Sequence, residues 1–327
     1  MTGTLLRSAL LGAMLAGAVF VGAGPVPAQS WPTRTITAII PFAAGNANDL
    51  AARIVLEQLS RQLGQTIVID NRPGAGGTTG VGAAARATPD GHTILVHSSS
   101  FSAAHVTHKS LPYDTVADFA AVSPFGSQPS VLVTAPSKDF KTAGELIAAA
   151  KAKPGAMNYA SAGIGAASHL TAEKFRLAAG ISAQHIPFRG PVEALTEVMA
   201  GRIDYYFLPI SPALPLIRDN KVIALAVSSP QRAPDLPEVQ TVSEAGLKNA
   251  DYVFWNGLFV PVKTPADIVN KLHQETQKAL AEPSVKERLA KIGVQTMSMS
   301  PQEFDSYFKA DVADTVKLAT QAGIEKQ

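Results

Sequence analysis

The sequence predicts an α/β protein of two lobes. Residues 35–97 alternate short β-branched runs with segments whose apolar residues recur at helical spacing, and the same alternation returns over residues 130–227. A strand signal at residues 252–261 is then followed only by helices. Those helices need an existing sheet to cover. We therefore expect the C-terminal third to fold back onto the first lobe, which leaves two crossings and a cleft between the lobes.

The first lobe should contain a parallel sheet, because its strands are separated by helices. Its expected strands cover residues 36–42, 66–69 and 93–97, and its expected helices cover 48–63, which Gly64 ends, and 79–87. Residues 114–129 show no strong period. We interpret them as the first crossing between the lobes.

The second lobe repeats this organisation. Its expected strands are 131–135, 157–161, 185–188, 203–208 and 222–227, and its expected helices are 142–151, a helix starting near 167, and 191–200. Three helices follow in the tail, at 265–280, 285–292 and 301–320. The predicted division of the chain is a signal peptide at 1–28, a first lobe of 29–128 plus 253–327, and a second lobe of 129–252.

Composition narrows the class of protein. The chain has 327 residues, no cysteine, 17% charged residues and a formal net charge of +2. This balance argues against a basic reader of nucleic acid.

The N-terminus reads as a secretory signal. Arg7 precedes an apolar run, and Val26, Pro27 and Ala28 match the small-residue cleavage pattern. We expect cleavage after Ala28 and a periplasmic or extracellular mature protein. An uncleaved anchor is the alternative, although the apolar run is shorter than the roughly 20 residues that a membrane span needs. No cysteine follows the run to carry a lipid.

Three loops at expected strand ends are rich in glycine or hydroxyl groups: residues 41–49, 98–102 and 161–169. Ligands of open α/β sheets bind beyond the carboxyl ends of the strands. The run YASAGIGAASHLT at residues 159–171 turns from strand to helix through glycines, which leaves N–H groups free at the positive end of a helix dipole. The pattern predicts a site for an anion, most simply a carboxylate.

Several residues allow a second interpretation. Asn48 and Asp49 could contact a ligand or cap the following helix, and Ser168 could donate to a carboxylate or cap its own helix. Arg189 could hold a carboxylate through two hydrogen bonds or lie free on the surface. One of Tyr205 and Tyr206, next to Asp204, should face inward.

Catalytic and cofactor motifs are weak. His97, His105 and His108 lack a metal-binding spacing, and no G-x-S-x-G element supports a hydrolase. The glycine runs at 74–82 and 163–168 do not complete a dinucleotide or P-loop motif. We expect no enzyme activity, no metal and no cofactor.

The ordered motifs together resemble the extracytoplasmic solute receptors of tripartite tricarboxylate transporters, the Bug family. They are ITAIIPFAAGNANDLAAR, VIDNRPGAGGTTG, PDGHTILVHSSS, PYD, YASAGIGAASHLTAEKF, IPFRGPVEAL, GRID, ALAVSSPQRAPDLPEVQTVSEAG and WNGLFVPVKTPADIV. They span nearly all of the mature chain.

The resemblance implies a type II periplasmic binding protein. It would be a monomer that closes on a small mono- or dicarboxylate, aliphatic or aromatic, and delivers it to a membrane permease with large and small integral subunits. It implies binding by backbone amides, hydroxyls and water rather than by an arginine clamp. Taken with the loops above, the predicted ligand-binding residues are Phe42, Ala43, Ala44, Gly45, Asn46, Asn48, Asp49, Ser98, Ser99, Ser161, Ala162, Gly163, Gly165, Ala166, Ser168, His169, Phe188, Arg189, Gly190 and Asp204.

Two departures from the family pattern fall in these loops. Asn46 replaces the second of two usual glycines, and Phe188 and Arg189 stand where tyrosine and lysine are common. Arg189 thereby becomes a candidate partner for a second carboxylate. The alternatives from other classes are a carboxylate sensor that serves a signalling partner and an extracytoplasmic hydrolase.

Overall fold

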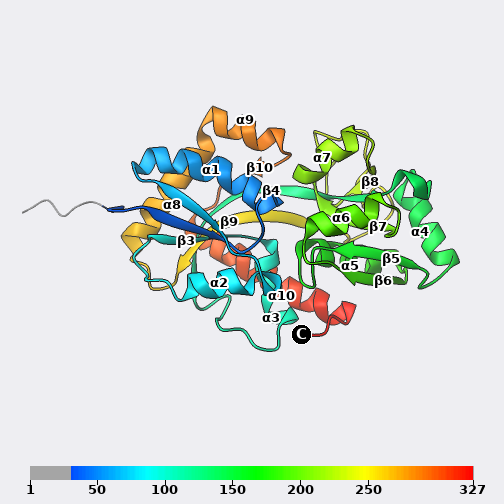
Figure 1. The fold of residues 1–327 in the computed structure, drawn as a ribbon, viewed down its shortest axis with the longest axis horizontal. Coiled ribbons are helices and arrows are strands. Elements are labelled where there is room, and N and C mark those ends of the chain that lie inside the picture. Colours follow the sequence, from blue (N-terminus) through cyan, green and yellow to red (C-terminus); the bar gives the residue numbers. More distant parts are fainter. Residues whose placement is uncertain (1–30, 327) are drawn as a thin grey trace, which may run out of the picture.

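The protein folds into two lobes that lie side by side, as the computed structural model of residues 31–326 shows (Figure 1). The predicted signal peptide at 1–28 lies outside the described residues. The strands follow the order β2-β1-β3-β9-β4-β7-β5-β6, and β8 and β10 both pair with β4. The strand pairs are parallel within each lobe's centre and antiparallel around β4 and β9, so the predicted two-lobed α/β fold with mixed sheets is confirmed.

The first lobe is built around β1, which pairs in parallel with β2 and β3. Strand β3 pairs antiparallel with β9, where Leu95 lies opposite Phe259. The helices and strands of the first lobe are β1 Ile36–Ile40, α1 Ala47–Leu63, β2 Ile67–Asn71, α2 Thr78–Ala85, β3 Thr93–Ser98, α3 Ala104–Thr107, β9 Val253–Pro261, α8 Ala266–Ala281, α9 Pro283–Lys291, β10 Gln295–Thr296 and α10 Pro301–Ala322.

The second lobe is built around β5, which pairs in parallel with β6 and β7. Its elements are α4 Ala143–Ala152, β5 Met157–Ser161, α5 Ala167–Ala179, β6 Ala183–Pro187, α6 Pro191–Met199, β7 Tyr205–Pro209, α7 Ile210–Arg218 and β8 Ile223–Val227. Strand β4, Phe119–Thr134, runs through both lobes.

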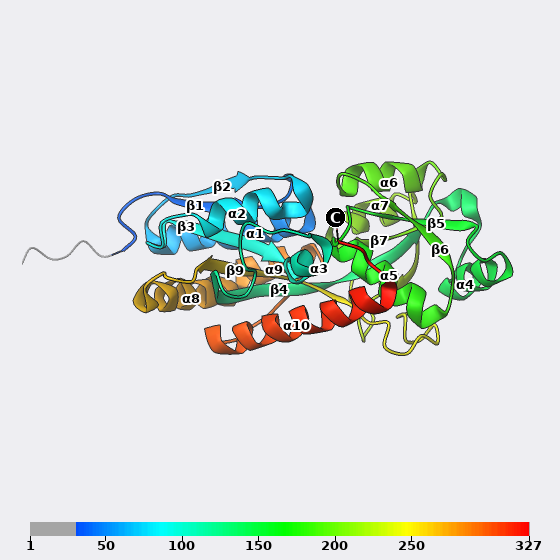
Figure 2. The same cartoon turned by 90° about the horizontal axis from the view of Figure 1, so that it is seen from below.

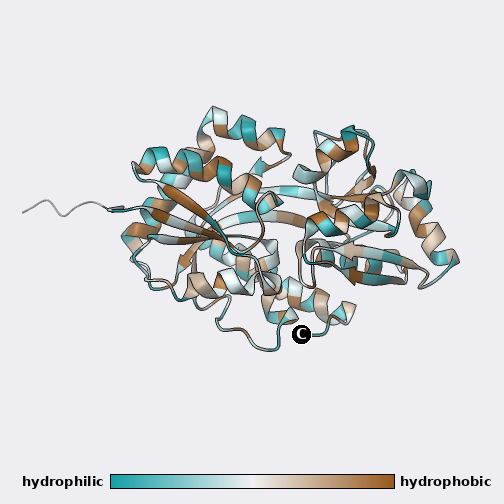
Figure 3. Cartoon of the chain, viewed as in Figure 1, coloured by the Kyte–Doolittle hydropathy of each residue, from teal (hydrophilic) through white to brown (hydrophobic). Residues whose placement is uncertain are grey.

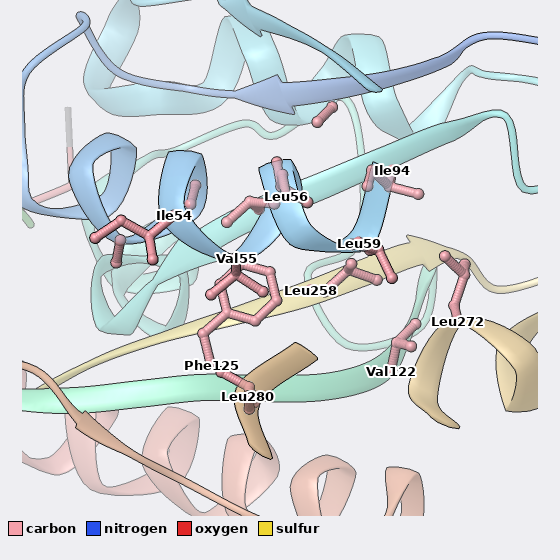
Figure 4. Packing of buried hydrophobic residues seen from close by; sticks show 14 of the residues in the cluster. Ile54, Val55, Leu56, Leu59, Ile94, Val122, Phe125, Leu258, Leu272 and Leu280 are labelled. Carbon is pink, nitrogen blue, oxygen red and sulfur yellow. The ribbon is translucent and has the colours of Figure 1, made fainter. Parts of the chain in front are cut away.

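Each lobe buries its own apolar core. In the first lobe, α1 directs Val55 and Leu59 toward Phe125 of β4 and Leu258 of β9 (Figure 4). A separate cluster in the second lobe gathers Val131 and other residues from the far half of β4. Outer helices such as α9 carry hydrophilic and hydrophobic residues side by side (Figure 3), as expected for helices with one face on a core. We propose that the lobes divide near residues 128 and 253, between these cores.

Helix α10 reaches both lobes (Figure 2). Its first half packs Phe304 and Phe308 into an aromatic cluster of the first lobe with Trp255. Near its end, Ala319 lies in a cluster with Leu170 of α5. The tail therefore folds back onto the first lobe, as expected, and extends beyond it to the second.

Two sequence predictions were wrong. Residues 114–129, interpreted as an irregular crossing, include most of the first half of β4, whose proline, glycine and serine residues hide the strand pattern and whose pairing with β9 shifts register twice. Helix α7 was not predicted, because Pro215 lies inside it and argues against a helix. Pairing with β9 holds the first half of β4 in place, and the core of the second lobe, which includes Ile210, Ala213 and Leu214, holds α7.

Candidate functional site: two helix N-termini at the lobe boundary

The predicted loops gather where the two lobes meet. Each follows the carboxyl end of a strand: the first loop, residues 42–49, follows β1, and the second loop, residues 161–169, follows β5. Ala47 and Ala167 are the first residues of α1 and α5, each is 4% exposed, and both lie in one hydrophobic cluster. The structure thus brings together two loops that are about 120 residues apart in sequence.

Asn46 caps helix α1. Its side-chain oxygen accepts hydrogen bonds from the backbone N–H of Asn48 at 2.8 Å and of Asp49 at 3.3 Å. The interpretation of Asn48 and Asp49 as helix caps is therefore wrong, since both lie within the first turn and are 1% exposed. The residue that departs from the family pattern is the one that supplies the cap.

Asp49 stabilises the first loop through hydrogen bonds of its carboxylate. It accepts hydrogen bonds from Gly45 N at 2.8 Å, Arg53 Nε at 2.8 Å and Asn71 Nδ2 at 3.1 Å. Burial alone would raise the pKa of this carboxyl, but these hydrogen bonds and the charge of Arg53 hold the pKa below its usual value. Asp49 is already satisfied, so we infer a supporting role for it.

Asn48 is held in the same way. Its Nδ2 donates to Val96 O at 2.9 Å, and its Oδ1 accepts from Asn256 Nδ2 at 2.7 Å. The side chains of the first loop thus point into the protein, while Ala43, Ala44 and Gly45 are exposed. Apart from Gly45 N, the amides of this exposed turn have no acceptor among the described residues.

The second loop uses its hydroxyl groups internally. Ser161 Oγ donates to Gly163 O at 3.0 Å and lies 2.6 Å from His185 Nε2. Ser168 Oγ accepts from Ala162 N at 3.0 Å. Both serines are buried, at 0% and 4% exposure. They hold the loop in shape and are not directed at solvent.

Helix α5 begins without a side-chain cap. Ala166 occupies the N-cap position and makes no side-chain hydrogen bond, so Ser168 does not cap its helix. The N–H groups of Ala167 and Ser168 have no acceptor within residues 31–326. Because these donors lie at the positive end of the helix dipole, the position favours an anion.

A stack of rings lies behind the second loop. His169 and His185 stack with centroids 3.9 Å apart and planes 8° apart, and Tyr159 stacks on His185 at 4.9 Å. His169 Nδ1 accepts from Gly165 N at 3.1 Å. Burial lowers the pKa of His169 to about 4 and that of His185 to about 3, helped by the charge of Arg176 in the first case and by His169 in the second. Both imidazoles are therefore neutral near pH 7.

The stack continues into a buried ion pair. The Tyr159 hydroxyl donates to Glu173, and Arg176 Nη2 donates to Glu173 Oε2 at 2.6 Å. Burial raises the pKa of Tyr159, and the neighbouring carboxylate adds to that effect. These hydrogen bonds hold Tyr159 in place, and with it the stacked rings of His185 and His169, which contact the second loop.

The other predicted residues lie around these loops. Phe188 N donates to Ser161 O at 3.0 Å, and Gly190 precedes α6. Arg189 is exposed, and its backbone N donates to Glu193 Oε2 at 3.2 Å. After β3, Ser98 Oγ lies 2.8 Å from Ser100 Oγ. Ser99 Oγ is buried without a hydrogen-bond partner among the described residues.

Asp204 does not belong to this group. It lies just before β7, where it accepts from Lys138 Nζ at 2.7 Å and from Asn158 N at 2.8 Å. Since β5 and β7 are parallel, this is the edge of the sheet opposite to Ser161. The geometry corrects the sequence prediction, and we leave Asp204 out of the site.

Sequence reasoning missed two parts of the neighbourhood. One is the turn from β7 into α7, where Ser211 N donates to Gln128 Oε1 at 3.1 Å. A strand followed by a helix was its signal, but the prolines of α7 hid the helix. The other is Thr107, which contacts Gly165 and gave no signal in the sequence.

Two hollows lie elsewhere on the molecule. One of about 670 Å³ is lined by α5, α10 and residues 248–253, and one of about 640 Å³ by residues 127–129, 229–235 and 293–296. Neither is lined by the first or second loop. We place the site at the loops because the free amide donors lie there. Among the described residues no group of three or more His, Cys, Asp or Glu is suited to a metal ion.

Comparison with known proteins decides the family. The model described as "Tripartite tricarboxylate transporter family receptor" matches residues 51–324. The chain belongs to this receptor family. The resemblance drawn from the sequence motifs is thereby confirmed. The family consists of periplasmic solute-binding receptors, and within residues 31–326 this member has no helix that is both long and apolar enough to cross a membrane.

Individual relatives and solved structures support the same family assignment. The receptor is 36% identical over 294 residues to a UPF0065 protein in the tcbD-tcbE intergenic region of Pseudomonas sp. strain P51, covering 90% of this chain and 88% of that one. It is similar to R. palustris Rpa4515 with adipate, with a TM-score of 0.87, 28% identity and coverage of 91% and 100%. It is also similar to MatC from Rhodopseudomonas palustris with bound malate, with a TM-score of 0.80, 29% identity and coverage of 88% and 99%.

Proposed function

We propose that this receptor binds a small carboxylate between its lobes and delivers it to the permease of a tripartite tricarboxylate transporter. The observation that carries the proposal is the meeting of two helix N-termini, one from each lobe, with that of α5 uncapped. Free amides at such a position bind negative oxygens. Two structural neighbours contain adipate and malate, which are both dicarboxylates.

The backbone N–H donors of the two loops can bind an anion although the site has no buried cation to balance its charge. Asp49, at the end of the first loop, already pairs with Arg53 at 2.8 Å. Neutral His169 and His185 add no charge behind the second loop. Charge on a ligand would therefore be met by amides and helix dipoles, which avoids the cost of desolvating a second ion.

Arg189 gives the site a second anchor. It is exposed at the turn between β6 and α6, and the described residues include no acid within ion-pair distance of its guanidinium. In a dicarboxylate, one end would lie at the amides of α5 and the other would reach Arg189. We propose mono- or dicarboxylate binding without catalysis, in the periplasm, by a monomer whose signal peptide has been removed.

Isothermal titration calorimetry with the purified mature chain tests the proposal. A panel of aliphatic and aromatic mono- and dicarboxylates should contain at least one that binds, and the matched methyl ester or amide should not. If no carboxylate binds, or if an ester binds as well as its acid, the proposed function is wrong. Delivery is tested separately by uptake of that ligand in cells with and without the receptor gene.

A further inference from the structure

The second loop packs closely against the first lobe at Gly165. Gly165 has a φ of 78°, and a Cβ built on it would lie 2.5 Å from Thr107 Cγ2 and 3.0 Å from Thr107 Oγ1. Thr107 is the last residue of α3 in the first lobe, whereas Gly165 lies two residues before α5 in the second. The backbone of one lobe therefore rests directly on a side chain of the other.

Thr107 presents a rigid surface. It is 2% exposed, and its Oγ1 donates to Ala103 O at 2.9 Å. A β-branched side chain has little freedom about χ1, so the position of the methyl group is fixed by the helix. Val106 beside it lies in the same hydrophobic cluster as Ala167 and Leu170, which anchors α3 against α5.

A second contact lies beside the first. Thr107 Oγ1 is 2.9 Å from His108 Nδ1, and His108 Nε2 is 3.2 Å from Ala75 O. A Cβ built on Gly76 would lie 3.4 Å from His108 Cε1 and 4.0 Å from Ile164 O. The turn at residues 74–77 and the end of α3 thus form one support for residues 164–165.

The contact is linked to the donors of the site. Gly165 N donates to His169 Nδ1, and His169 is in the first turn of α5, next to Ser168. Moving Gly165 away from the first lobe would move the N-terminus of α5 with it. The distance between the N-termini of α1 and α5 therefore depends on how closely Gly165 approaches Thr107.

We infer that Thr107 is a positioning residue for the ligand site of the opposite lobe: its methyl group sets the approach of Gly165, and hence the spacing of the two helix N-termini around a carboxylate. The inference rests on the proposed function. Thr107 acts here through its contact with Gly165, without touching the ligand.

A double-mutant cycle in the full mature chain tests the inference, with affinity for the carboxylate found by calorimetry as the readout. Gly165→Ala should weaken binding by about tenfold, because the added methyl group overpacks against Thr107. Thr107→Ser removes Cγ2 and should weaken wild-type binding by about threefold. In the Gly165→Ala background it should instead strengthen binding by about threefold, because it makes room.

Two controls separate this effect from general damage. Gly180→Ala adds a methyl group at a similar φ of 60° with nothing within 4 Å, so it carries the backbone strain alone. Thr134→Ser removes a buried methyl group from the second lobe, where Thr134 Oγ1 donates to Asp204 O. Both should lower the melting temperature without changing affinity.

The inference is overturned if Thr107→Ser has the same effect in both backgrounds, or if Gly180→Ala weakens binding as much as Gly165→Ala. Failure of the wild-type chain to bind any carboxylate would count against the proposed function instead. If Gly165→Ala does not fold, Thr107→Val tests the same inference, since it keeps a methyl group toward Gly165 and replaces the hydroxyl with a second methyl group. Affinity within about twofold of wild type is then expected, and a loss as large as that of Thr107→Ser overturns the role of the methyl group.

Discussion

His169 and His185 stack face to face behind the second loop, with ring centroids 3.9 Å apart. Each also touches that loop: His169 Nδ1 accepts from Gly165 N, and His185 Nε2 lies 2.6 Å from Ser161 Oγ. The charged groups that face the stack are Glu173 and Arg176, which pair with each other. Two imidazoles at this distance repel each other when both are protonated, and a proton on His169 Nδ1 would remove the acceptor of Gly165 N, so the shape of the loop depends on their protonation.

Acid should therefore destabilise the protein through this stack. The pKa of His169 is about 4 in the folded state, below its ordinary value of 6.5. In the window between these values the unfolded chain binds the proton and the folded chain does not, so the stabilisation present above pH 6.5 is lost as the pH falls toward 4. His169 alone would account for about 3 kcal/mol over that window, at about 1.4 kcal/mol per pKa unit.

Urea unfolding from pH 7.5 to pH 4 measures this effect. His169→Asn keeps an acceptor near Gly165 N and removes the titrating ring, so its free energy of unfolding should fall less with acid than that of wild type. His105→Asn, at a half-buried histidine outside the stack, serves as the control. Equal slopes for wild type and His169→Asn would show that the stack does not govern acid stability.

Ala166, at the uncapped N-terminus of α5, offers a second prediction. Its φ of −60° and ψ of 151° suit a capping residue. Ala166→Asp should stabilise the free protein by about 1 kcal/mol by accepting from the free N–H of Ser168. It should also abolish carboxylate binding, because its own carboxylate occupies the donors and repels the ligand.

Ala166→Asn is the matched control, because it caps without a charge. Thermal unfolding and calorimetry should show a similar gain in stability for both variants and a smaller loss of affinity for the asparagine. Undiminished binding by Ala166→Asp would place the ligand away from the N-terminus of α5.

Removing the supporting serines should weaken binding indirectly. Ser161→Ala removes the donor to Gly163 O, and Ser168→Ala removes the acceptor of Ala162 N. Each should cost about 1–3 kcal/mol of binding free energy, since the loop no longer holds its amides in place. Ser306→Ala, at an exposed serine of α10, is the control. If both loop variants bind like the control, these hydroxyls do not shape the site.

The sequence predicted the alternation of strands and helices and the two loops, because hydrophobic period and glycine-rich turns are local signals. Gly64, for example, ends α1 in the left-handed conformation, as expected. It could not show that Ser161 and Ser168 turn inward, because their partners are backbone groups of the same folded loop and, for Ser161, a histidine of the neighbouring strand β6. Asp204 was misplaced for a similar reason: its position beside a loop in sequence gave no indication of which sheet edge it occupies.

Contacts between the lobes were beyond prediction. Thr107 and Gly165 are 58 residues apart and lie in separate lobes, and neither carries a pattern that points to the other. The long strand β4 was hidden because Pro124 and Pro129 argue against a strand, and only pairing with β9, with its register shifts, accommodates them.

Arg189 should distinguish one class of ligand from another. Arg189 is exposed and follows Phe188, whose N donates to Ser161 O of the second loop, while its own backbone N donates to Glu193 Oε2 at 3.2 Å. Arg189→Ala should therefore weaken the binding of dicarboxylates by about tenfold and change the binding of monocarboxylates little. Only a dicarboxylate has a second charge that can reach Arg189. Arg189→Lys should keep part of the preference, because a point charge remains without the paired geometry.

The measurement is calorimetry with a dicarboxylate and its monocarboxylate analogue of equal chain length, in wild type, Arg189→Ala and Arg189→Lys. Arg202→Ala, at an exposed arginine paired with Glu197 near the opposite sheet edge, controls for the loss of a surface charge. An equal loss for both ligands would mean that Arg189 supports the loop or acts through long-range charge. A loss confined to the dicarboxylate would place the second carboxylate at the turn between β6 and α6.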